Sequence, residues 1–408
     1  MLAFAAATLL TPHGPLDHAL LLVDHGRIVA VDSQSARSCP AGVSPVDLGN
    51  NLIAPAYLDL HVHGSAGYDV MDAPEGLPVI ERFLARHGVA GYMPTTVTAP
   101  VDRTLRALER LADAIEEREK VQGISYGDGC GTDESRISAR ENAPSDGRAQ
   151  PLGIHLEGPF ISHARRGVHR SEHLLPAKVE TFERFWQAAR GRIRLMTIAP
   201  ELEGAIELIR TASARGVCVS LGHSDADFAT AEFAVTAGAR HTTHIFNAMR
   251  PLGQRDPGVA GAALTDARVT ADLIADGIHL DPAIVKLVAL AKGPDQTVLI
   301  TDAISATGMP DGRYPLGSME VDVKNGRCES DGKLAGSVLT MDRAVFNLAR
   351  FAEWSLPLAA AAASRNPARV VGSNNKGVLA PGADADFIVL DREGNVIRTF
   401  IGGRESSL

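Results

Sequence analysis

Between about residue 55 and residue 305, short apolar runs alternate with longer amphipathic stretches. Apolar runs are typical of buried strands, and apolar positions recurring every three or four residues are typical of helices packed on a sheet. The pattern predicts eight strands, which end near His63, Thr95, Glu157, Ala199, His223, His244, Asp276 and Asp302. It predicts helices at 77–88, 102–118, 179–190, 203–215, 225–238 and 281–292. Eight such repeats, of which the seventh is irregular, predict an α/β fold, a closed (β/α)8 barrel of the TIM type.

The two ends of the chain have a different pattern. Residues 19–23 and 27–31 flank the turn Asp24-His25-Gly26, and residues 386–390 and 396–401 flank a second polar turn. Such pairs of short apolar runs are typical of hairpins. We therefore predict a small β-sandwich module formed by both termini (residues 1–54 and 380–408) around a barrel at residues 55–379.

Residues 119–150 fit neither pattern, because they are rich in Gly, Ser, Asp, Glu and Arg and contain few apolar residues. This composition is typical of a long exposed insertion with little regular structure. We predict such an insertion after the second barrel helix, with a lid over the active site as the alternative.

Composition and charge exclude some classes of binding partner. The 408 residues include 45% hydrophobic and 22% charged residues, and 40 basic against 49 acidic side chains give a net charge of −9. This balance argues against nucleic-acid and membrane binding, but it allows an anionic small substrate. The four cysteines form no C-x-x-C pair, no Lys or Arg precedes Arg27, and no apolar run reaches membrane-spanning length. We predict a cytoplasmic protein.

The first candidate site is the His61-Val62-His63 motif at the end of the first barrel strand. Side chains at positions i and i+2 of a strand point to the same face, so the two imidazoles would project together. Such a pair is a plausible start of a divalent-metal site, although surface or buried structural histidines are the alternative for an isolated pair.

Other predicted strands also end in residues that bind metals or transfer protons. The carboxyl ends of all barrel strands meet at one rim, where the active sites of such barrels lie. Glu157, His223 and His244 form a three-ligand set that leaves a position for water, and His61 and His63 could hold a second ion with Glu157 bridging. Asp302 is placed to take a proton from that water and to pass it to a leaving amine. His155 is interpreted as a packing or supporting residue.

At these residues the chain resembles a known family. Its motifs are similar to those of the amidohydrolase superfamily and, more narrowly, of the N-acetylglucosamine-6-phosphate deacetylase family. The resemblance covers nearly the whole chain except residues 119–150. It rests on Leu58-Asp59-Leu60-His61-Val62-His63-Gly64, His155-Leu156-Glu157-Gly158-Pro159-Phe160, Leu221-Gly222-His223-Ser224-Asp225-Ala226, Thr243-His244-Ile245-Phe246-Asn247-Ala248-Met249, Ala275-Asp276-Gly277-Ile278-His279 and Thr301-Asp302-Ala303.

The resemblance implies removal of acetate from N-acetylglucosamine 6-phosphate, with glucosamine 6-phosphate as the other product. It implies Asp302 as the catalytic aspartate and His169 as the residue that polarises the acetamide carbonyl. The metal ligands that it implies are Glu157, His223 and His244. Since some members of the family lack the His-x-His pair and hold one ion, the pair present here allows a second ion, and the predicted metal-site residues are His61, His63, Glu157, His223, His244 and Asp302. The implied substrate contacts are His169, Asn247 and Ala248 for the sugar, Arg255 and His279 for the phosphate, and the loop Leu334-Ala335-Gly336-Ser337. In the family the phosphate contacts reach across a homodimer interface, so the resemblance implies a homodimer in which Arg255 and His279 reach the neighbouring active site.

Several alternatives remain open at this stage. One or two ions could bind, with zinc as the first expectation and iron, manganese or cobalt as alternatives. The galactosamine epimer is the nearest other substrate, followed by the cyclic amides or N-acyl amino acids of other amidohydrolases. A catalytically silent sugar-phosphate sensor is disfavoured, because every expected ligand position is filled. The fourth strand lacks the modified lysine that bridges two metals in many amidohydrolases, so any bridge must come from Glu157.

Overall fold

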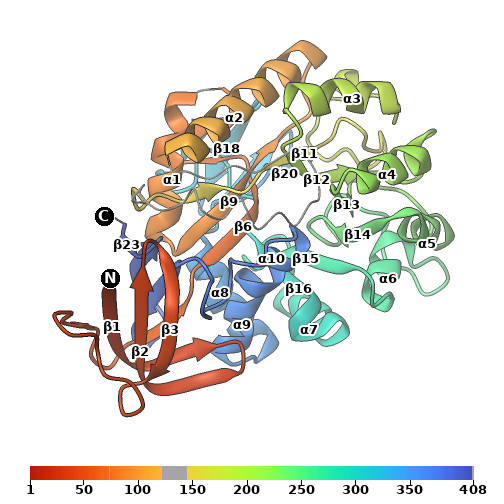
Figure 1. The fold of residues 1–408 in the computed structure, drawn as a ribbon. Helices are drawn as coiled ribbons and strands as arrows, with labels where there is room; N and C mark the ends of the chain where they lie inside the picture. The colour runs from red at the N-terminus through yellow and green to blue at the C-terminus, as the bar shows by residue number, and fades with distance from the viewer. Residues whose placement is uncertain (73, 122–144, 407–408) are drawn as a thin grey trace.

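The computed structural model of the chain describes residues 1–72, 74–121 and 145–406. Eight strands of this part pair in parallel, each with the next along the chain (Figure 1). They are β6 (Tyr57–Val62), β9 (Val89–Thr96), β11 (Ile154–Glu157), β12 (Ile193–Ile198), β13 (Cys218–Leu221), β14 (Ala239–Thr242), β15 (Thr270–Ile274) and β16 (Thr297–Ile300). The short β10 (Gln150–Pro151) adds to β9. The predicted (β/α)8 barrel is confirmed, and each strand ends within two residues of the predicted position.

The barrel closes between its first and last strands. Val62 at the end of β6 forms a parallel bridge with Ala303, beyond the end of β16. The backbone N–H groups of His63 and Gly64 both donate to the Ala303 carbonyl, over 2.8 and 3.0 Å. This closure brings the ends of β6 and β16 together at the rim where the candidate site was predicted.

Helices cover the outside of the barrel. They are α1 (Leu77–Arg86), α2 (Val101–Val121), α3 (Val179–Ala188), α4 (Ala205–Ala214), α5 (Phe228–Ala237), α6 (Gly258–Thr265), α7 (Pro282–Gln296) and α8 (Met341–Ala352), followed by α9 (Leu356–Ala363) and α10 (Arg365–Val370). In α1, for example, Ile80 and Leu84 lie one turn apart and are both buried against the sheet. The pattern missed α6, because this eight-residue helix is apolar and mostly buried, without a polar face. The remaining short helices are η1 (Pro74–Gly76) and η3 (Ser171–His173).

The chain termini form a separate sheet, as predicted. Its strands are β1 (Leu2–Thr11), β2 (Gly14–Asp24), β3 (Arg27–Ser33), β4 (Val46–Asp47), β5 (Leu52–Pro55), β21 (Phe387–Leu390), β22 (Val396–Ile401) and β23 (Arg404–Glu405). The sheet order is β23-β22-β21-β5-β1-β2-β3, with β4 beside β1. The backbone N–H of Ile28 donates to the Ala383 carbonyl over 2.9 Å, which brings β3 back to the chain just before β21. The enclosed core contains Phe4, Phe387 and Phe400, and both termini lie in this module (Figure 1).

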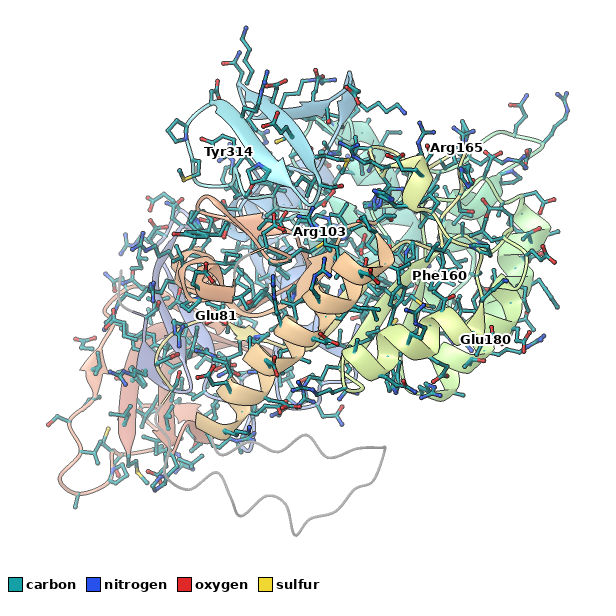
Figure 2. The ribbon with its side chains drawn as sticks, turned by 90° about the horizontal axis from the view of Figure 1, so that it is seen from above. Glu81, Arg103, Phe160, Arg165, Glu180 and Tyr314 are labelled. Atoms are coloured by element: carbon teal, nitrogen blue, oxygen red, sulfur yellow. The ribbon has the colours of Figure 1, made fainter. Side chains whose placement is uncertain are left out.

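A four-stranded antiparallel sheet between β16 and α8 was not predicted. It contains β17 (Gly312–Leu316), β18 (Met319–Lys324), β19 (Arg327–Ser330) and β20 (Lys333–Leu334). A small hairpin of β7 (Gly64–Ser65) and β8 (Tyr68–Asp69) lies against it, because the backbone N–H of Gly317 donates to an Asp69 carboxylate oxygen over 2.7 Å. In Figure 2 the strands around Tyr314 and the loop that carries Arg165 lie on the same side of the molecule. Leu316 of β17 and Lys333 of β20 line the same cavity as the residues at the barrel strand ends, so this sheet stands beside the barrel mouth.

The predicted polar insertion lies mostly outside the described residues. Helix α2 runs to Val121, and the chain is described again from residue 145. There Arg148 lies 3.2 Å from the buried carboxylate of Glu81, which Arg118 approaches at 3.4 Å. Residues 122–144 fall outside the described part, so the prediction for them stays untested. None of the described helices has the length and apolar character that a membrane crossing requires.

Candidate active site

The predicted strand-end residues share one rim of the barrel, and three of them share an unusual backbone conformation. His223, His244 and Asp302 each lie two residues beyond the last residue of their strand, with φ values of 48°, 32° and 52°. Left-handed backbone is uncommon for residues other than glycine, and it concentrates at functional sites, where the surrounding structure maintains it. The same turn after three parallel strands directs three side chains to one place.

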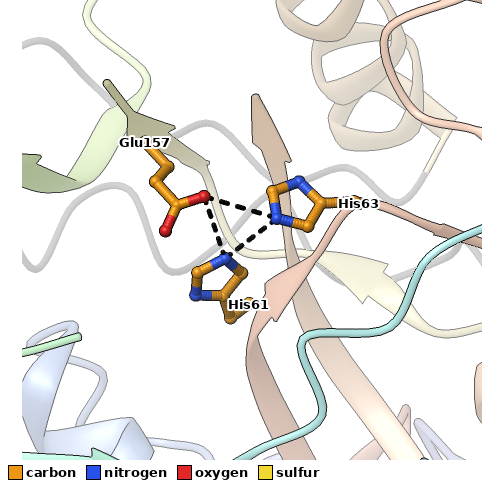
Figure 3. A group of neighbouring side chains, drawn as sticks. All are labelled: His61, His63 and Glu157. Carbon is orange, nitrogen blue, oxygen red and sulfur yellow. Dashed lines mark hydrogen bonds and ion pairs between the residues drawn. The ribbon is translucent and has the colours of Figure 1, made fainter. Parts of the chain in front are cut away.

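His61, His63 and Glu157 form the first group (Figure 3). The two imidazole Nε2 atoms are 3.1 Å apart. Both face the same oxygen of Glu157, Oε2, at 3.5 Å from His61 and 3.4 Å from His63. All three side chains are buried. Three donor atoms converging in this way form a candidate metal site.

Glu157, His223 and His244 form the second group. Here the other carboxylate oxygen, Oε1, lies 3.4 Å from His223 Nε2 and 3.1 Å from His244 Nε2. The two oxygens of one carboxylate therefore face two different pairs of imidazoles. This arrangement places Glu157 where a bridging ligand between two ions would lie, in agreement with the absence of a lysine at the end of β12.

Hydrogen bonds at Nδ1 of His63 and of His223 support the role of both rings as metal ligands through Nε2. His63 Nδ1 lies 3.0 Å from the Thr95 carbonyl oxygen, and His223 Nδ1 lies 3.0 Å from the Arg165 carbonyl oxygen. A carbonyl oxygen only accepts, so both Nδ1 atoms carry the ring proton. In the neutral rings, the form that binds a metal ion, the lone pairs of both Nε2 atoms then face Glu157. One carboxylate with several neutral imidazoles suits zinc and related divalent ions.

The charges of the site favour a cation. Burial would raise the pKa of Glu157, but His61 and the imidazoles bonded to the carboxylate hold that pKa well below its ordinary value. Burial lowers the pKa of His63, yet its contacts with Asp302 and Glu157 outweigh burial and raise that pKa to about 10. Burial lowers the pKa of His223 to about 4, which keeps this ring neutral. The ionised carboxylates of Glu157 and of Asp302 thus attract positive charge, which a divalent ion can supply.

Asp302 lies against the first group and also faces the cavity. Its Oδ1 is 3.5 Å from His61 Nε2 and 3.3 Å from His63 Nε2. Burial would raise the pKa of Asp302, but His61 and His63 lower it below the ordinary value, so the carboxylate is ionised at neutral pH. An ionised carboxylate beside a metal site can accept a proton from water.

A cavity of about 340 Å³ opens above these groups. The predicted site residues that line it are His63, Glu157, His169, His223, His244, Asn247, Ala248, His279, Asp302, Leu334 and Gly336. His61, Ala335 and Ser337 are buried behind its wall. Ser337 supports that wall, because its backbone N–H donates to the Asp302 carbonyl over 2.8 Å. The structure therefore brings all predicted site residues together except one.

The exception is Arg255, which is exposed and does not line the cavity of its own chain. His279 also differs from the prediction, because its side chain lies in the cavity of its own chain. It lines its own cavity, where Asp276 Oδ2 accepts from its Nδ1 over 2.7 Å, whereas the prediction had it reach a neighbouring subunit. The physical reason is that Asp276 follows β15 at the rim and holds the ring inward.

Sequence reasoning missed Lys333 and Thr98. Among the described residues that line the cavity, Lys333 is the only lysine or arginine, and its ammonium donates to the Gly167 carbonyl over 3.3 Å. Lys333 immediately precedes the predicted substrate loop, and this position was the one sequence signal that could have identified it.

Thr98 follows β9 and contacts His169. Nothing in its local sequence marks it as a site residue.

His155 has the supporting position expected of it. The ring is fully buried, with Nε2 2.8 Å from the Thr197 hydroxyl and Nδ1 3.2 Å from the Leu60 carbonyl oxygen. Both nitrogens thus have protein partners, and the ring packs edge-on against His61 at 4.6 Å between centroids.

Comparison with known proteins decides the family. A model of the amidohydrolase family matches residues 52–405. The chain belongs to the amidohydrolase family. This membership confirms the resemblance seen in the motifs and makes the chain a hydrolase. The family is metal-dependent, and the cluster of His and Glu side chains in this amidohydrolase could bind a metal.

Individual relatives are similar over almost the whole chain. N-acetylgalactosamine-6-phosphate deacetylase of Escherichia coli O157:H7 is 36% identical over 98% of this chain and 98% of its own. N-acetylglucosamine-6-phosphate deacetylase of Lysinibacillus sphaericus is 36% identical over 89% of this chain and 87% of its own. A solved structure of a mutant N-acetyl-D-glucosamine-6-phosphate deacetylase from Mycobacterium smegmatis, in complex with N-acetyl-D-glucosamine-6-phosphate, superposes with a TM-score of 0.85. Its identity is 30%, over 100% of this chain and 99% of that one.

Proposed function

We propose that this amidohydrolase hydrolyses the acetamide of N-acetylglucosamine 6-phosphate, giving acetate and glucosamine 6-phosphate. The observation that carries the proposal is the placement of Glu157 between two imidazole pairs at the base of a cavity, with the ionised Asp302 beside it. The names of the relatives and the ligand of the Mycobacterium smegmatis structure support the choice of substrate. The galactosamine epimer is the second candidate, favoured by the similarity to the Escherichia coli enzyme.

The cofactor is one or two divalent ions, with zinc as the first candidate. Glu157, His223 and His244 would hold one ion, and His61, His63 and Glu157 would hold a second, with Asp302 beside it. A bound divalent ion makes a water molecule more acidic and stabilises negative charge on a carbonyl oxygen.

Two side chains of the chain itself then act on the substrate. Asp302 takes a proton from the attacking water and delivers it to the amine nitrogen when the carbon–nitrogen bond breaks. His169 lines the cavity and donates a hydrogen bond to the acetamide oxygen as negative charge develops there. Preorganised donors of this kind are typically the largest contribution to such catalysis.

The sugar and its phosphate occupy the outer part of the cavity. Asn247, Ala248 and the loop Leu334-Ala335-Gly336-Ser337 are the proposed sugar contacts, and His279 is a proposed phosphate contact. Lys333 adds a positive charge at the same cavity. Arg255 is exposed in its own chain. We therefore propose that the protein is a homodimer in which Arg255 of each subunit contacts the phosphate bound in the other subunit. We also propose that the protein is located in the cytoplasm.

The phosphate contacts lead to a prediction for substrate preference. We expect Arg255→Ala to raise KM for the phosphorylated sugar about tenfold or more, because a planar guanidinium donates two parallel hydrogen bonds to phosphate. Activity towards unphosphorylated N-acetylglucosamine should change little. Lys333→Met tests the lysine in the same way. Steady-state kinetics with both substrates measure the effect, and Arg268→Ala, on an exposed arginine that pairs with Asp266, is the control. An equal loss on both substrates would remove either residue from the phosphate site.

The proposed function is tested by measuring acetate release from the two epimeric sugar phosphates and from an N-acyl amino acid. We expect release from the gluco epimer with the highest kcat/KM, loss of activity after chelation, and recovery when a divalent ion is added back. Preference for the galacto epimer would select the second candidate. Release only from the N-acyl amino acid would overturn both.

A further inference from the structure

Thr98 lies two residues beyond β9, at the same rim as the metal site, and is buried. Its hydroxyl oxygen is 2.7 Å from Nδ1 of His169. Its backbone N–H donates to the same ring nitrogen over 3.3 Å. Two groups of one residue thus converge on a single atom of the histidine to which the proposed function gives the oxyanion contact.

These two contacts determine which nitrogen of His169 carries the ring proton. A backbone N–H can only donate, so Nδ1 must offer its lone pair, and the proton of the neutral ring is on Nε2. His169 lines the cavity, and its Nε2 lies 3.6 Å from Glu157 Oε2, which is longer than a direct hydrogen bond. The Nε2–H group is therefore available to a substrate oxygen.

The backbone next to Glu157 makes room for Thr98. Gly158 has φ of 69°, and a Cβ atom at this position would lie 2.1 Å from the Thr98 hydroxyl oxygen and 3.6 Å from His169 Nδ1. Any residue larger than glycine would displace the hydroxyl from the ring. The chain thus uses a glycine directly after Glu157 to place a hydroxyl group behind His169.

We propose that Thr98 is a positioning residue that keeps His169 in the tautomer with its proton on Nε2, directed at the carbonyl oxygen of the substrate. The proposal rests on the proposed function, because it assigns the purpose of the tautomer to amide hydrolysis. With the proton on Nδ1, the ring would present a lone pair to the developing negative charge and would oppose the reaction. A preorganised donor avoids this cost at the moment of reaction.

The tautomer itself can be observed without measuring activity. In zinc-loaded protein with ¹⁵N-labelled histidine, the His169 signals are assigned by their loss in His169→Gln. We expect a protonated Nε2 and an unprotonated Nδ1 in the otherwise unchanged protein. A protonated Nδ1 would overturn the proposal. Because this measurement uses the natural Thr98, it stands even where a variant at this position does not fold.

Kinetics of variants then test whether Thr98 acts through His169. We expect Thr98→Val, which keeps the shape and removes the hydroxyl, to lower kcat about tenfold with KM within about twofold and with unchanged bound metal. Thr98→Ser should restore most of the activity. In a His169→Gln background, Thr98→Val should change kcat less than about twofold, because the ring that it positions is gone. An equal loss in both backgrounds, or no loss in either, would contradict the proposal.

The proposed function and the proposed role of Thr98 can fail separately. If the protein releases no acetate from either sugar phosphate, the proposed function is wrong, while the NMR measurement still tests the tautomer. If acetate is released but the ring proton is on Nδ1, the proposed function stands and the role of Thr98 is wrong.

Discussion

We expect Asp302→Asn to lower kcat about a thousandfold or more while the metal content stays near that of the unchanged protein. Asp302 faces His61 and His63 at 3.5 and 3.3 Å and is ionised, but the second metal group, Glu157 with His223 and His244, is complete without it. The amide of asparagine keeps the size of the side chain and cannot accept the proton of the attacking water. A thousandfold loss corresponds to about 4 kcal/mol of transition-state stabilisation.

Acetate release and metal analysis on the same preparation measure this effect. Asp281→Asn is the matched control, because Asp281 caps α7 away from the cavity and asparagine caps helices equally well. Turnover of the Asp302→Asn variant within a few-fold of the control would contradict the role of Asp302 in proton transfer. A parallel loss of metal would show instead that Asp302 acts mainly as a ligand.

Glu157→Gln has the second large expected effect, a loss of all bound metal and of activity. The carboxylate offers Oε1 to His223 and His244 and Oε2 to His61 and His63, so it belongs to both groups. A neutral amide is a weaker ligand, and its nitrogen cannot coordinate a cation. We expect metal analysis after dialysis to find less than about a tenth of the content of the unchanged protein, and Glu180→Gln on the surface of α3 to retain all of it (Figure 2).

Single histidine variants separate the two groups. If Glu157 bridges two ions, His61→Asn should remove one ion and His223→Asn the other, and only Glu157→Gln should remove both. If His61→Asn leaves the metal content unchanged, the chain binds a single ion at Glu157, His223 and His244. Full metal content in Glu157→Gln would contradict both versions of the metal site.

Much of the barrel could be predicted because its strands are short, apolar and separated by amphipathic helices. The strand ends followed from the same pattern, and parallel strands place all their carboxyl ends at one rim, so His61, Glu157, His223 and Asp302 could be expected together. The sheet of β17–β20 was missed although β18 alternates strictly between buried and exposed positions and is followed by Asn325-Gly326, a strong hairpin signal. No helix or strand was predicted between Asp302 and residue 386, so this alternation was not used.

The fine geometry of the site had no sequence signal. Nothing in the residues around His223, His244 and Asp302 indicates left-handed backbone, because the local sequence does not show which groups lie beside the ends of β13, β14 and β16. The contact of Thr98 with His169 joins positions 71 residues apart, which no local pattern reveals. The exposure of Arg255 depends on how its loop folds outside the barrel.

The central claim is that these strand-end side chains hold the ion on which deacetylation depends. The most direct test is a titration of chelated, metal-free protein with zinc while acetate release from N-acetylglucosamine 6-phosphate is measured. We expect no turnover without metal and a rate that rises in proportion to bound zinc until one or two equivalents are bound. Undiminished acetate release by the metal-free protein, or zinc that binds without restoring any release, would contradict the central claim.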